Sequence, residues 1–211
     1  MKIFLGGTFD PIHKAHIQLA LTVSNQFEHP VSFLPLAGVP NYKAAPLASK
    51  EDRLAMLKLI TNKYPDRLDI DYSEINQTEY SPTINTLKKM RKLYGNGLPF
   101  FFIIGADSLY SLDSWNNYQE LFNLTNFIVI NRPGYALNQA SPQLIMQIQA
   151  RTQPTFVKIV PSGQIIFINF KPMPISSTEI RTKCAAKQAI DLLVEPEIAQ
   201  YIYTNNLYKG I

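Results

Sequence analysis

Short runs of apolar or alternating residues follow one another along this chain, separated by longer segments in which apolar residues recur every three or four positions. Runs of this kind, bounded by glycine, proline or polar residues, are typical of strands. We predict strands at 2–5, 31–36, 69–72, 100–104, 127–130, 156–160 and 165–168. The segment 100–104 is apolar throughout, which is typical of a strand covered on both faces.

The longer segments carry the spacing of amphipathic helices, and several have recognisable starts. Ser49 followed by Asp52 is typical of a helix N-terminus, and Pro82 stands where the first turn of a helix tolerates a missing N–H. Residues 134–154 are polar and predict no firm element. We predict helices at 15–27, from Ser49, at 83–94, from about Ser177 and from about Glu195.

Strands and helices alternate through the first 130 residues, which favours an α/β fold. We predict a doubly wound, Rossmann-like parallel sheet with helices on both faces and a small helical C-terminal part. Ligands of such sheets bind at the carboxyl ends of the strands, so the loops after Leu5, Leu36 and Ile104 are the expected location of the chemistry. The length of 211 residues favours one domain, 1–211, with a helical segment at about 176–211 packed on it.

Composition narrows the class of protein. The net charge of +4 fits an anionic ligand, but no run of Lys and Arg suggests nucleic-acid binding. The single cysteine, Cys184, excludes an internal disulfide and a structural zinc site of cysteines. No apolar run is long enough for a membrane span, and Gly6 and Gly7 interrupt the first apolar residues before they could form a signal peptide. We therefore expect a cytoplasmic protein, and the oligomeric state stays open.

The segment 6–16, Gly-Gly-Thr-Phe-Asp-Pro-Ile-His-Lys-Ala-His, has a composition suited to binding phosphates. Gly6 and Gly7 allow a tight turn and a close approach of phosphate oxygens to backbone N–H groups. Thr8 adds a hydroxyl donor, and the N-terminus of the following helix adds partial positive charge. His13 and His16, three residues apart, can face one phosphate together.

Other interpretations of this segment fit less well. A Gly-Gly pair after a strand is often only a turn, and a zinc site would need further ligands, whereas His29 is the only other histidine. The spacing matches neither a Walker A loop nor the Gly-x-Gly-x-x-Gly fingerprint, so a dehydrogenase using a dinucleotide is not expected.

Taken whole, the segment resembles the Gly-Gly-Thr-Phe-Asp-Pro-x-His-x-Gly-His signature of the nucleotidyltransferase superfamily, with Ala15 in place of the usual glycine. Residues 175–181, Ile-Ser-Ser-Thr-Glu-Ile-Arg, resemble its second motif, Ile-Ser-Ser-Thr-x-Ile-Arg. Alone, Ser-Ser-Thr before a helix is most often an N-cap. The segments 102–108 and 131–134, with Trp115, are similar to bacterial nicotinate-mononucleotide adenylyltransferases, a resemblance that spans the chain.

The resemblance implies adenylyl transfer: nicotinate mononucleotide and ATP give nicotinate adenine dinucleotide and pyrophosphate. The implied roles are shared among three sets of residues. The catalytic set is His13, His16 and Arg181. The ATP-binding set is Gly6, Gly7, Thr8, Phe9, Gly105, Asp107, Ile175, Ser176, Ser177 and Thr178. The substrate-binding set is Lys43, Thr83, Trp115 and Arg132.

The resemblance further implies Mg²⁺ that is bound mainly through the ATP phosphates, with no protein metal site. ATP and nicotinate mononucleotide are the expected partners. Departures from the family at 41–42, Pro82 and Asn85 leave the preference for nicotinate over nicotinamide open. Three alternatives therefore stay open: transfer to nicotinamide mononucleotide, transfer to phosphopantetheine, and a nucleotide-binding sensor without catalysis.

Overall fold

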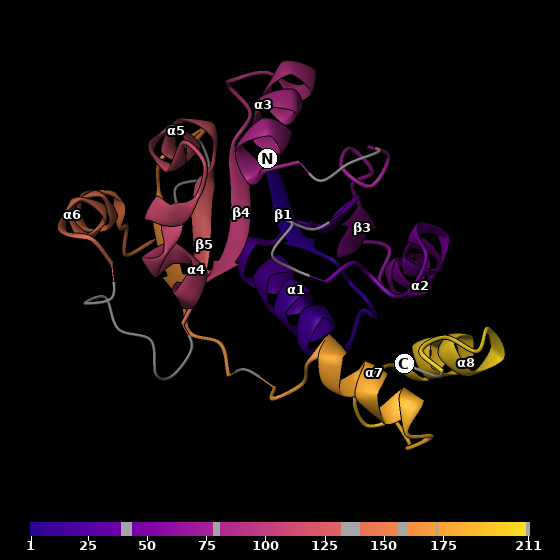
Figure 1. Cartoon of the computed structure of the whole chain (residues 1–211). Helices are drawn as coiled ribbons and strands as arrows, with labels where there is room; N and C mark the ends of the chain where they lie inside the picture. Colours follow the sequence, from indigo (N-terminus) through magenta and orange to yellow (C-terminus); the bar gives the residue numbers. More distant parts are fainter. Residues whose placement is uncertain (39–43, 78–80, 132–139, 156–159, 172, 210–211) are drawn as a thin grey trace. The chain divides into compact units, whose positions relative to one another are not determined.

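The computed structural model describes residues 1–38, 44–77, 81–131, 140–155, 160–171 and 173–209 (Figure 1). Within these ranges no helix is long and apolar enough to cross a membrane. The elements in chain order are β1 (Lys2–Gly7), α1 (Lys14–Phe27), β2 (Val31–Pro35), α2 (Lys50–Lys63), β3 (Leu68–Ile70), α3 (Thr83–Tyr94), β4 (Phe100–Gly105), α4 (Ala106–Tyr110), the 3₁₀ helix η1 (Leu112–Ser114), α5 (Tyr118–Leu124), β5 (Asn126–Ile130), α6 (Pro142–Arg151), β6 (Ile165–Ile168), α7 (Ser177–Ala185) and α8 (Pro196–Thr204).

The strands form a six-stranded sheet in the order β3-β2-β1-β4-β5-β6. The neighbours β1 and β4, β4 and β5, β5 and β6, and β2 and β3 all pair in parallel. Every residue of β2 and of β5 is buried, so both faces of these strands are covered. The order reverses between β1 and β4, which makes their carboxyl ends the topological switch point of the sheet. This architecture confirms the prediction of a doubly wound, Rossmann-like α/β fold.

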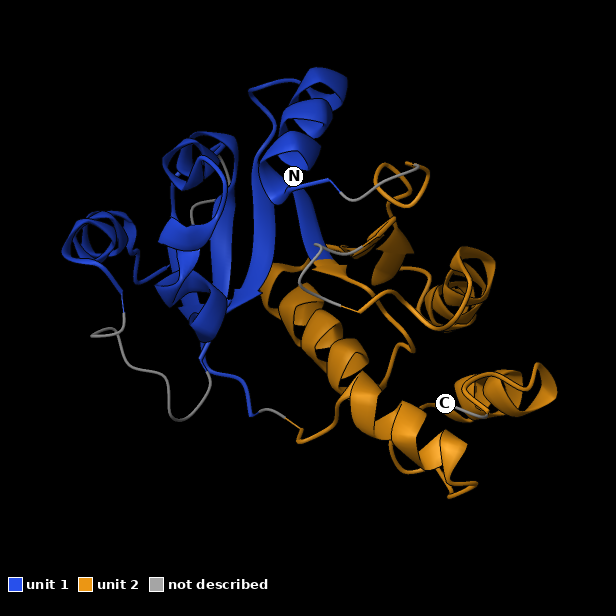
Figure 2. Ribbon diagram, viewed as in Figure 1, with its two compact units in different colours: residues 1–5, 81–171 blue, residues 6–80, 172–211 orange. Residues whose placement is uncertain are grey.

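The chain divides into two compact units, coloured separately in Figure 2. Unit 1 comprises residues 1–5 and 81–171, and there α3 packs against α5 while α4 contacts β4 and β5. Unit 2 comprises residues 6–80 and 172–211, and there α1 and α2 pack on β2 and β3 while α8 packs on α2. The prediction of one domain over the whole chain stays a prediction.

Most predicted elements agree with the structure within one or two residues, but the strand predicted at 69–72 is shifted. β3 ends at Ile70 because the Asp71 carboxylate accepts the Ser73 N–H at 2.9 Å, which turns the backbone. Tyr72 is 40% exposed. The strand predicted at 156–160 lies outside the described residues except for Val160, which is in no strand.

Unit 1 contains a buried arginine that sequence analysis did not identify. Arg91 in α3 is 5% exposed, and its guanidinium donates hydrogen bonds of 2.6–3.3 Å to backbone carbonyl groups. The acceptors are the oxygens of Gly95, Asn96, Leu98, Leu124 and Pro161. Its Cζ also lies 3.9 Å from the centre of the Phe100 ring. Arg91 therefore satisfies carbonyl groups of three loops that surround the amino ends of β4 and β5.

Candidate active site

The loop between β1 and α1 is shaped by a glycine and an aromatic ring. A Cβ added to Gly7 would lie 2.9 Å from Cζ of Phe9, so only glycine lets that ring pack in its place. Phe9 has a φ of 51°, a left-handed conformation that is rare for a bulky residue. Its side chain is 2% exposed and packs edge-to-face on Phe33, with ring centres 5.3 Å apart. Any contact of Phe9 with ATP would therefore come from its backbone.

The two histidines stand together at the start of α1. His13 is the N-cap residue and His16 lies in the first turn. Their rings are stacked, with centres 3.7 Å apart and planes inclined by 21°. The Phe9 ring meets the His16 ring edge-on at 5.2 Å and supports the pair from the loop side. The structure thus brings both predicted catalytic imidazoles to the positive end of one helix.

Burial keeps the first imidazole uncharged. Desolvation lowers the pKa of His13 from 6.5 to about 4, and the side chain is 4% exposed. Its Nδ1 is buried with no hydrogen-bond partner among the described residues. At pH 7 His13 is therefore neutral, and it can act as a hydrogen-bond donor or acceptor but not as a fixed positive charge.

This lowered pKa predicts acid sensitivity of the fold. We expect His13 to remove about 3 kcal/mol from the free energy of unfolding between pH 7 and pH 4. The unfolded chain binds the proton near pH 6.5, whereas the folded chain binds it only near pH 4. The stabilisation is therefore complete above pH 6.5 and is lost as the pH falls toward 4.

Urea titrations of the wild type and of His13→Gln across this pH range measure the effect. The variant has no imidazole at this position, so its free energy of unfolding should fall less steeply in acid. Identical pH dependence in the two proteins would show that His13 is not desolvated in the folded state.

Asp10 is a second buried polar residue of the loop, and its side chain is 3% exposed. Oδ1 accepts the Ala48 N–H at 3.0 Å and the Tyr208 hydroxyl at 2.8 Å, and Oδ2 accepts the Leu47 N–H at 2.8 Å. Arg181 Nη1 lies 3.8 Å from Oδ2 and donates to the Asp10 carbonyl oxygen at 2.7 Å. The carboxylate therefore binds groups from two distant segments of unit 2.

The second predicted motif packs against this same loop. The Ser177 hydroxyl donates to the Pro11 carbonyl oxygen at 2.9 Å, and Arg181 Nη2 donates to Thr178 Oγ1 at 3.1 Å. Ser176 is the N-cap of α7, since its Oγ accepts the Glu179 N–H at 3.1 Å. The two sequence motifs, far apart in the chain, are thus joined within unit 2 through Arg181 and Ser177.

Arg53 completes the set of buried polar residues around the loop. Its side chain is 2% exposed, and Nη1 donates to the carbonyl oxygens of Thr8 and Leu36 at 2.9 Å each. Asp10, Arg53 and Tyr208 are not among the site residues predicted from the sequence. The signal for Asp10 was its place inside the first motif. Nothing local to Tyr208 identifies its partner, which lies 198 residues away.

Gly6, in β1, and Ile175, just before the N-cap of α7, belong to unit 2. Four other predicted residues belong to unit 1. Gly105 ends β4 and is the N-cap of α4, and Asp107 lies in the first turn of that short helix. Thr83 opens α3 after Pro82. The half-buried Trp115 follows η1, and its backbone N–H donates to the Leu112 carbonyl oxygen at 2.9 Å. Two further predicted residues, Lys43 and Arg132, lie outside the described residues.

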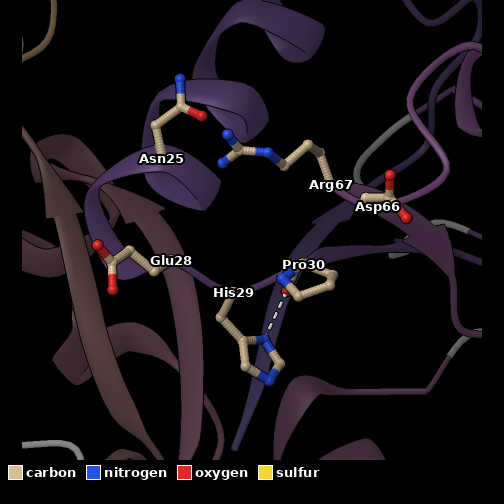
Figure 3. A pocket seen from close by; sticks show the side chains of 6 residues that line it. All are labelled: Asn25, Glu28, His29, Pro30, Asp66 and Arg67. Atoms are coloured by element: carbon tan, nitrogen blue, oxygen red, sulfur yellow. Dashed lines mark hydrogen bonds between the residues drawn. The ribbon is translucent and has the colours of Figure 1, made fainter.

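A cavity of about 520 Å³ lies elsewhere in unit 2 and contains none of these residues (Figure 3). It is lined by Asn25, Glu28, His29, Pro30, Asp66 and Arg67. Asn25 lies in the last turn of α1, and the other five residues directly precede β2 or β3, so the cavity lies near the amino ends of strands rather than at their carboxyl ends. Two carboxylates accompany the Arg67 guanidinium, which makes the cavity unsuited to a polyphosphate.

Comparison with known proteins agrees with the fold and the motifs. Residues 4–183 match the cytidylyltransferase-like family model. A protein of Chromobacterium violaceum named "Probable nicotinate-nucleotide adenylyltransferase" is 34% identical over 97% of this chain and 96% of its own. A Hahella chejuensis protein of the same name is 33% identical over 99% of this chain and 96% of its own.

A solved structure, Plasmodium falciparum nicotinic acid mononucleotide adenylyltransferase complexed with NaAD, has the same fold. Its TM-score is 0.73 at 23% identity, covering 99% of this chain and 98% of that one. The paired histidines, the second motif bound to their loop, and the full-length relatives lead to one assignment. This chain belongs to the cytidylyltransferase-like family and, within it, to the nicotinate-nucleotide adenylyltransferases.

Proposed function

We propose that this protein transfers the AMP moiety of ATP to nicotinate mononucleotide, giving nicotinate adenine dinucleotide and pyrophosphate. One observation carries the proposal. Arg181 and Ser177 are bound to the backbone of Asp10 and Pro11, in the loop that leads into the stacked His13 and His16. Two groups of phosphate-binding side chains thereby belong to one site at a helix N-terminus.

The reaction needs positioning and charge stabilisation rather than a covalent enzyme intermediate. A 5′-phosphate oxygen of the mononucleotide attacks the α-phosphorus of ATP in line and forms the new P–O bond. The bond from the α-phosphorus to the bridging oxygen breaks, and its electron pair leaves with pyrophosphate. Since the nucleophile is already an anion, no general base is required.

The residues of unit 2 would stabilise the charge that develops on the phosphates. His13 and His16 would donate hydrogen bonds to oxygens of the α- and β-phosphates, and these bonds strengthen as pyrophosphate departs. Arg181, with Ser177 and Thr178, would bind the β- and γ-phosphates. Because His13 is neutral at pH 7, its contribution is a hydrogen bond and not a salt bridge.

Magnesium fits this site as part of the substrate. Among the described residues, no three His, Cys, Asp or Glu side chains gather in a way that could hold a metal ion. Both oxygens of Asp10, the carboxylate of the loop, already accept hydrogen bonds from protein groups. Mg²⁺ would therefore enter with ATP, held mainly by phosphate oxygens and water.

We also infer that the protein is cytoplasmic, because both of its proposed substrates are charged nucleotides that are found in the cytoplasm.

By the family resemblance, residues of unit 1 would determine whether nicotinate or nicotinamide mononucleotide is the preferred acceptor. Thr83 opens α3, where hydroxyl and backbone donors can bind the pyridine carboxylate, and the Trp115 ring can stack on the pyridine. Gly105 and Asp107 would contact adenosine. Lys43 and Arg132 are proposed for the substrate phosphate by family resemblance alone.

Pyrophosphate release tests the proposal directly. With ATP and Mg²⁺ present, we expect kcat/KM for nicotinate mononucleotide to exceed that for nicotinamide mononucleotide by about 10-fold or more, because helix-terminal donors favour a carboxylate over an amide. Equal rates with the two mononucleotides would contradict the nicotinate assignment. Release with phosphopantetheine alone would reassign the acceptor, and no release with any acceptor would favour a nucleotide-binding sensor.

A further inference from the structure

Tyr208 is a buried aromatic residue in an unusual backbone conformation. Its φ is 61°, and the side chain is 6% exposed. Left-handed φ values are unfavourable for bulky residues and persist where the surroundings hold them in place. At Tyr208 the identified contact of this kind is the 2.8 Å hydrogen bond from its hydroxyl to Asp10 Oδ1.

The direction of this hydrogen bond is fixed by chemistry. Burial, and then the nearby Asp10 charge, raise the pKa of the Tyr208 hydroxyl well above its usual value. The Tyr208 hydroxyl therefore stays protonated and donates a hydrogen bond to the carboxylate. With Leu47 and Ala48 also donating, the hydroxyl supplies one of the bonds that a buried carboxylate requires.

Asp10 is well placed to pass this constraint to the catalytic histidines. Only Pro11 and Ile12 separate it from His13, and Ile12 is fully buried. The Asp10 and Pro11 carbonyl oxygens also bind Arg181 and Ser177. A shift of the Asp10 carboxylate would therefore displace the backbone that carries His13 and the attachment points of the second motif.

The chain around Tyr208 is attached to the start of α1 at another point. The Lys14 N–H donates to the Leu193 carbonyl oxygen at 3.1 Å, and Lys14 Nζ donates to the carbonyl oxygens of Asp191 and Leu192 at 2.9 and 3.2 Å. The segment 191–208 thus contacts residues on both sides of His13. Because Asp10 is held on one side of His13 and Lys14 on the other, both the position and the orientation of His13 are restricted.

We propose that Tyr208 is a positioning residue for adenylyl transfer, whose hydroxyl holds Asp10 and through it the loop that carries His13 and His16. Tyr208 need not touch either substrate. This inference rests on the proposed function, because it concerns the geometry of that same phosphate site. Positioning errors near 1 Å lower rates by about 100-fold, so even a partial displacement is measurable.

The test compares two tyrosine-to-phenylalanine variants in the full chain. Tyr208→Phe removes the bond to Asp10 and keeps the ring. Tyr201→Phe removes a matched bond, from the Tyr201 hydroxyl to Asp52 Oδ1 at 2.9 Å, that does not involve the loop. For each protein we would measure kcat, KM for both substrates, the melting temperature, and the pKa of His13 from the NMR shift of its ring carbon.

We expect Tyr208→Phe to lower kcat by about 10-fold, with each KM changed by less than about 2-fold, because catalytic groups move while substrate contacts remain. Its His13 pKa should rise from about 4 toward 6.5 as the loosened loop admits water. Tyr201→Phe should keep the wild-type kcat and His13 pKa. Asp10→Glu, which moves the same carboxylate by one CH₂, should reproduce both changes of Tyr208→Phe.

Several outcomes would overturn the inference. A Tyr208→Phe protein with wild-type kcat and a His13 pKa near 4 would show that the hydroxyl positions nothing. A lower melting temperature alone, equal in both tyrosine variants, would show a purely structural role. If the wild type released no pyrophosphate, the proposed function would fail, whereas the His13 titration would still decide whether Tyr208 sets the loop.

Discussion

Replacing His16 with alanine is expected to lower kcat by about 100- to 1,000-fold, the usual cost of removing one donor to developing charge. The ring of His16 stacks on that of His13 and lies in the first turn of α1, where the helix dipole adds positive potential. A bond that strengthens as pyrophosphate leaves acts on the transition state, so KM for ATP should change much less than kcat. Steady-state pyrophosphate release across ATP concentrations measures both.

The matched control is Gln18→Ala, an exposed position two residues further along the same helix. It should leave kcat at the wild-type value, which separates an effect of the imidazole from an effect on α1. A His16→Ala protein that turns over at a near-normal rate would refute the phosphate role of the stacked pair. Loss of the far-ultraviolet helical signal in the variant would instead show that the ring is structural.

Replacing Arg91 with lysine is expected to lower the free energy of unfolding by about 4 kcal/mol. A lysine keeps the charge but has three donors on one atom, whereas the guanidinium reaches five carbonyl oxygens in a plane. Each buried carbonyl left without a donor costs about 1–3 kcal/mol, and the contact with the Phe100 ring weakens as well. Urea unfolding at pH 7 measures the change.

Lys92→Met is the control, since Lys92 is the next residue of α3 and is exposed. Surface substitutions of this kind change stability by about 0.5 kcal/mol or less. If Arg91→Lys were as stable as the wild type, the carbonyl groups around Arg91 would have to find other donors. Unfolding data for the double variant would show whether the two positions act independently.

The hydrophobic pattern predicted the elements that have one continuous apolar face. α3 and β6 begin and end where the pattern places them, because the apolar residues of α3 recur with the helical period and β6 is an uninterrupted apolar run between polar residues. The helices α4, α5 and α6 were not predicted, and two of them are short, at 5 and 7 residues. α6 had a usable start signal, since Ser141 caps it through the Leu144 N–H and Pro142 follows. Only Leu144 and Ile148 in α6 are buried, which gave too weak a periodicity.

In the candidate site, too, features formed by neighbouring residues could be predicted from the sequence, whereas contacts between residues far apart in the chain could not. The stacked histidines and the capped start of α7 are local features of two motifs, so sequence alone located them. The bonds of Asp10 to Tyr208 and of Arg53 to Thr8 join residues far apart in the chain. A polar residue has no periodic signature that names its partner, so these contacts require the folded structure.

The hydrogen bond between Asp10 and Tyr208 has a consequence for synthesis of the protein. A ribosome makes Tyr208 198 residues after Asp10, which at usual elongation rates is a delay of about 10 to 40 seconds. During that interval the glycines and both histidines are already outside or leaving the ribosome, but the carboxylate beside them lacks one of its donors. A nascent chain would therefore contain every residue of the first motif before the Asp10 carboxylate has its Tyr208 donor, and the full rate would be reached only after residue 208 has been made.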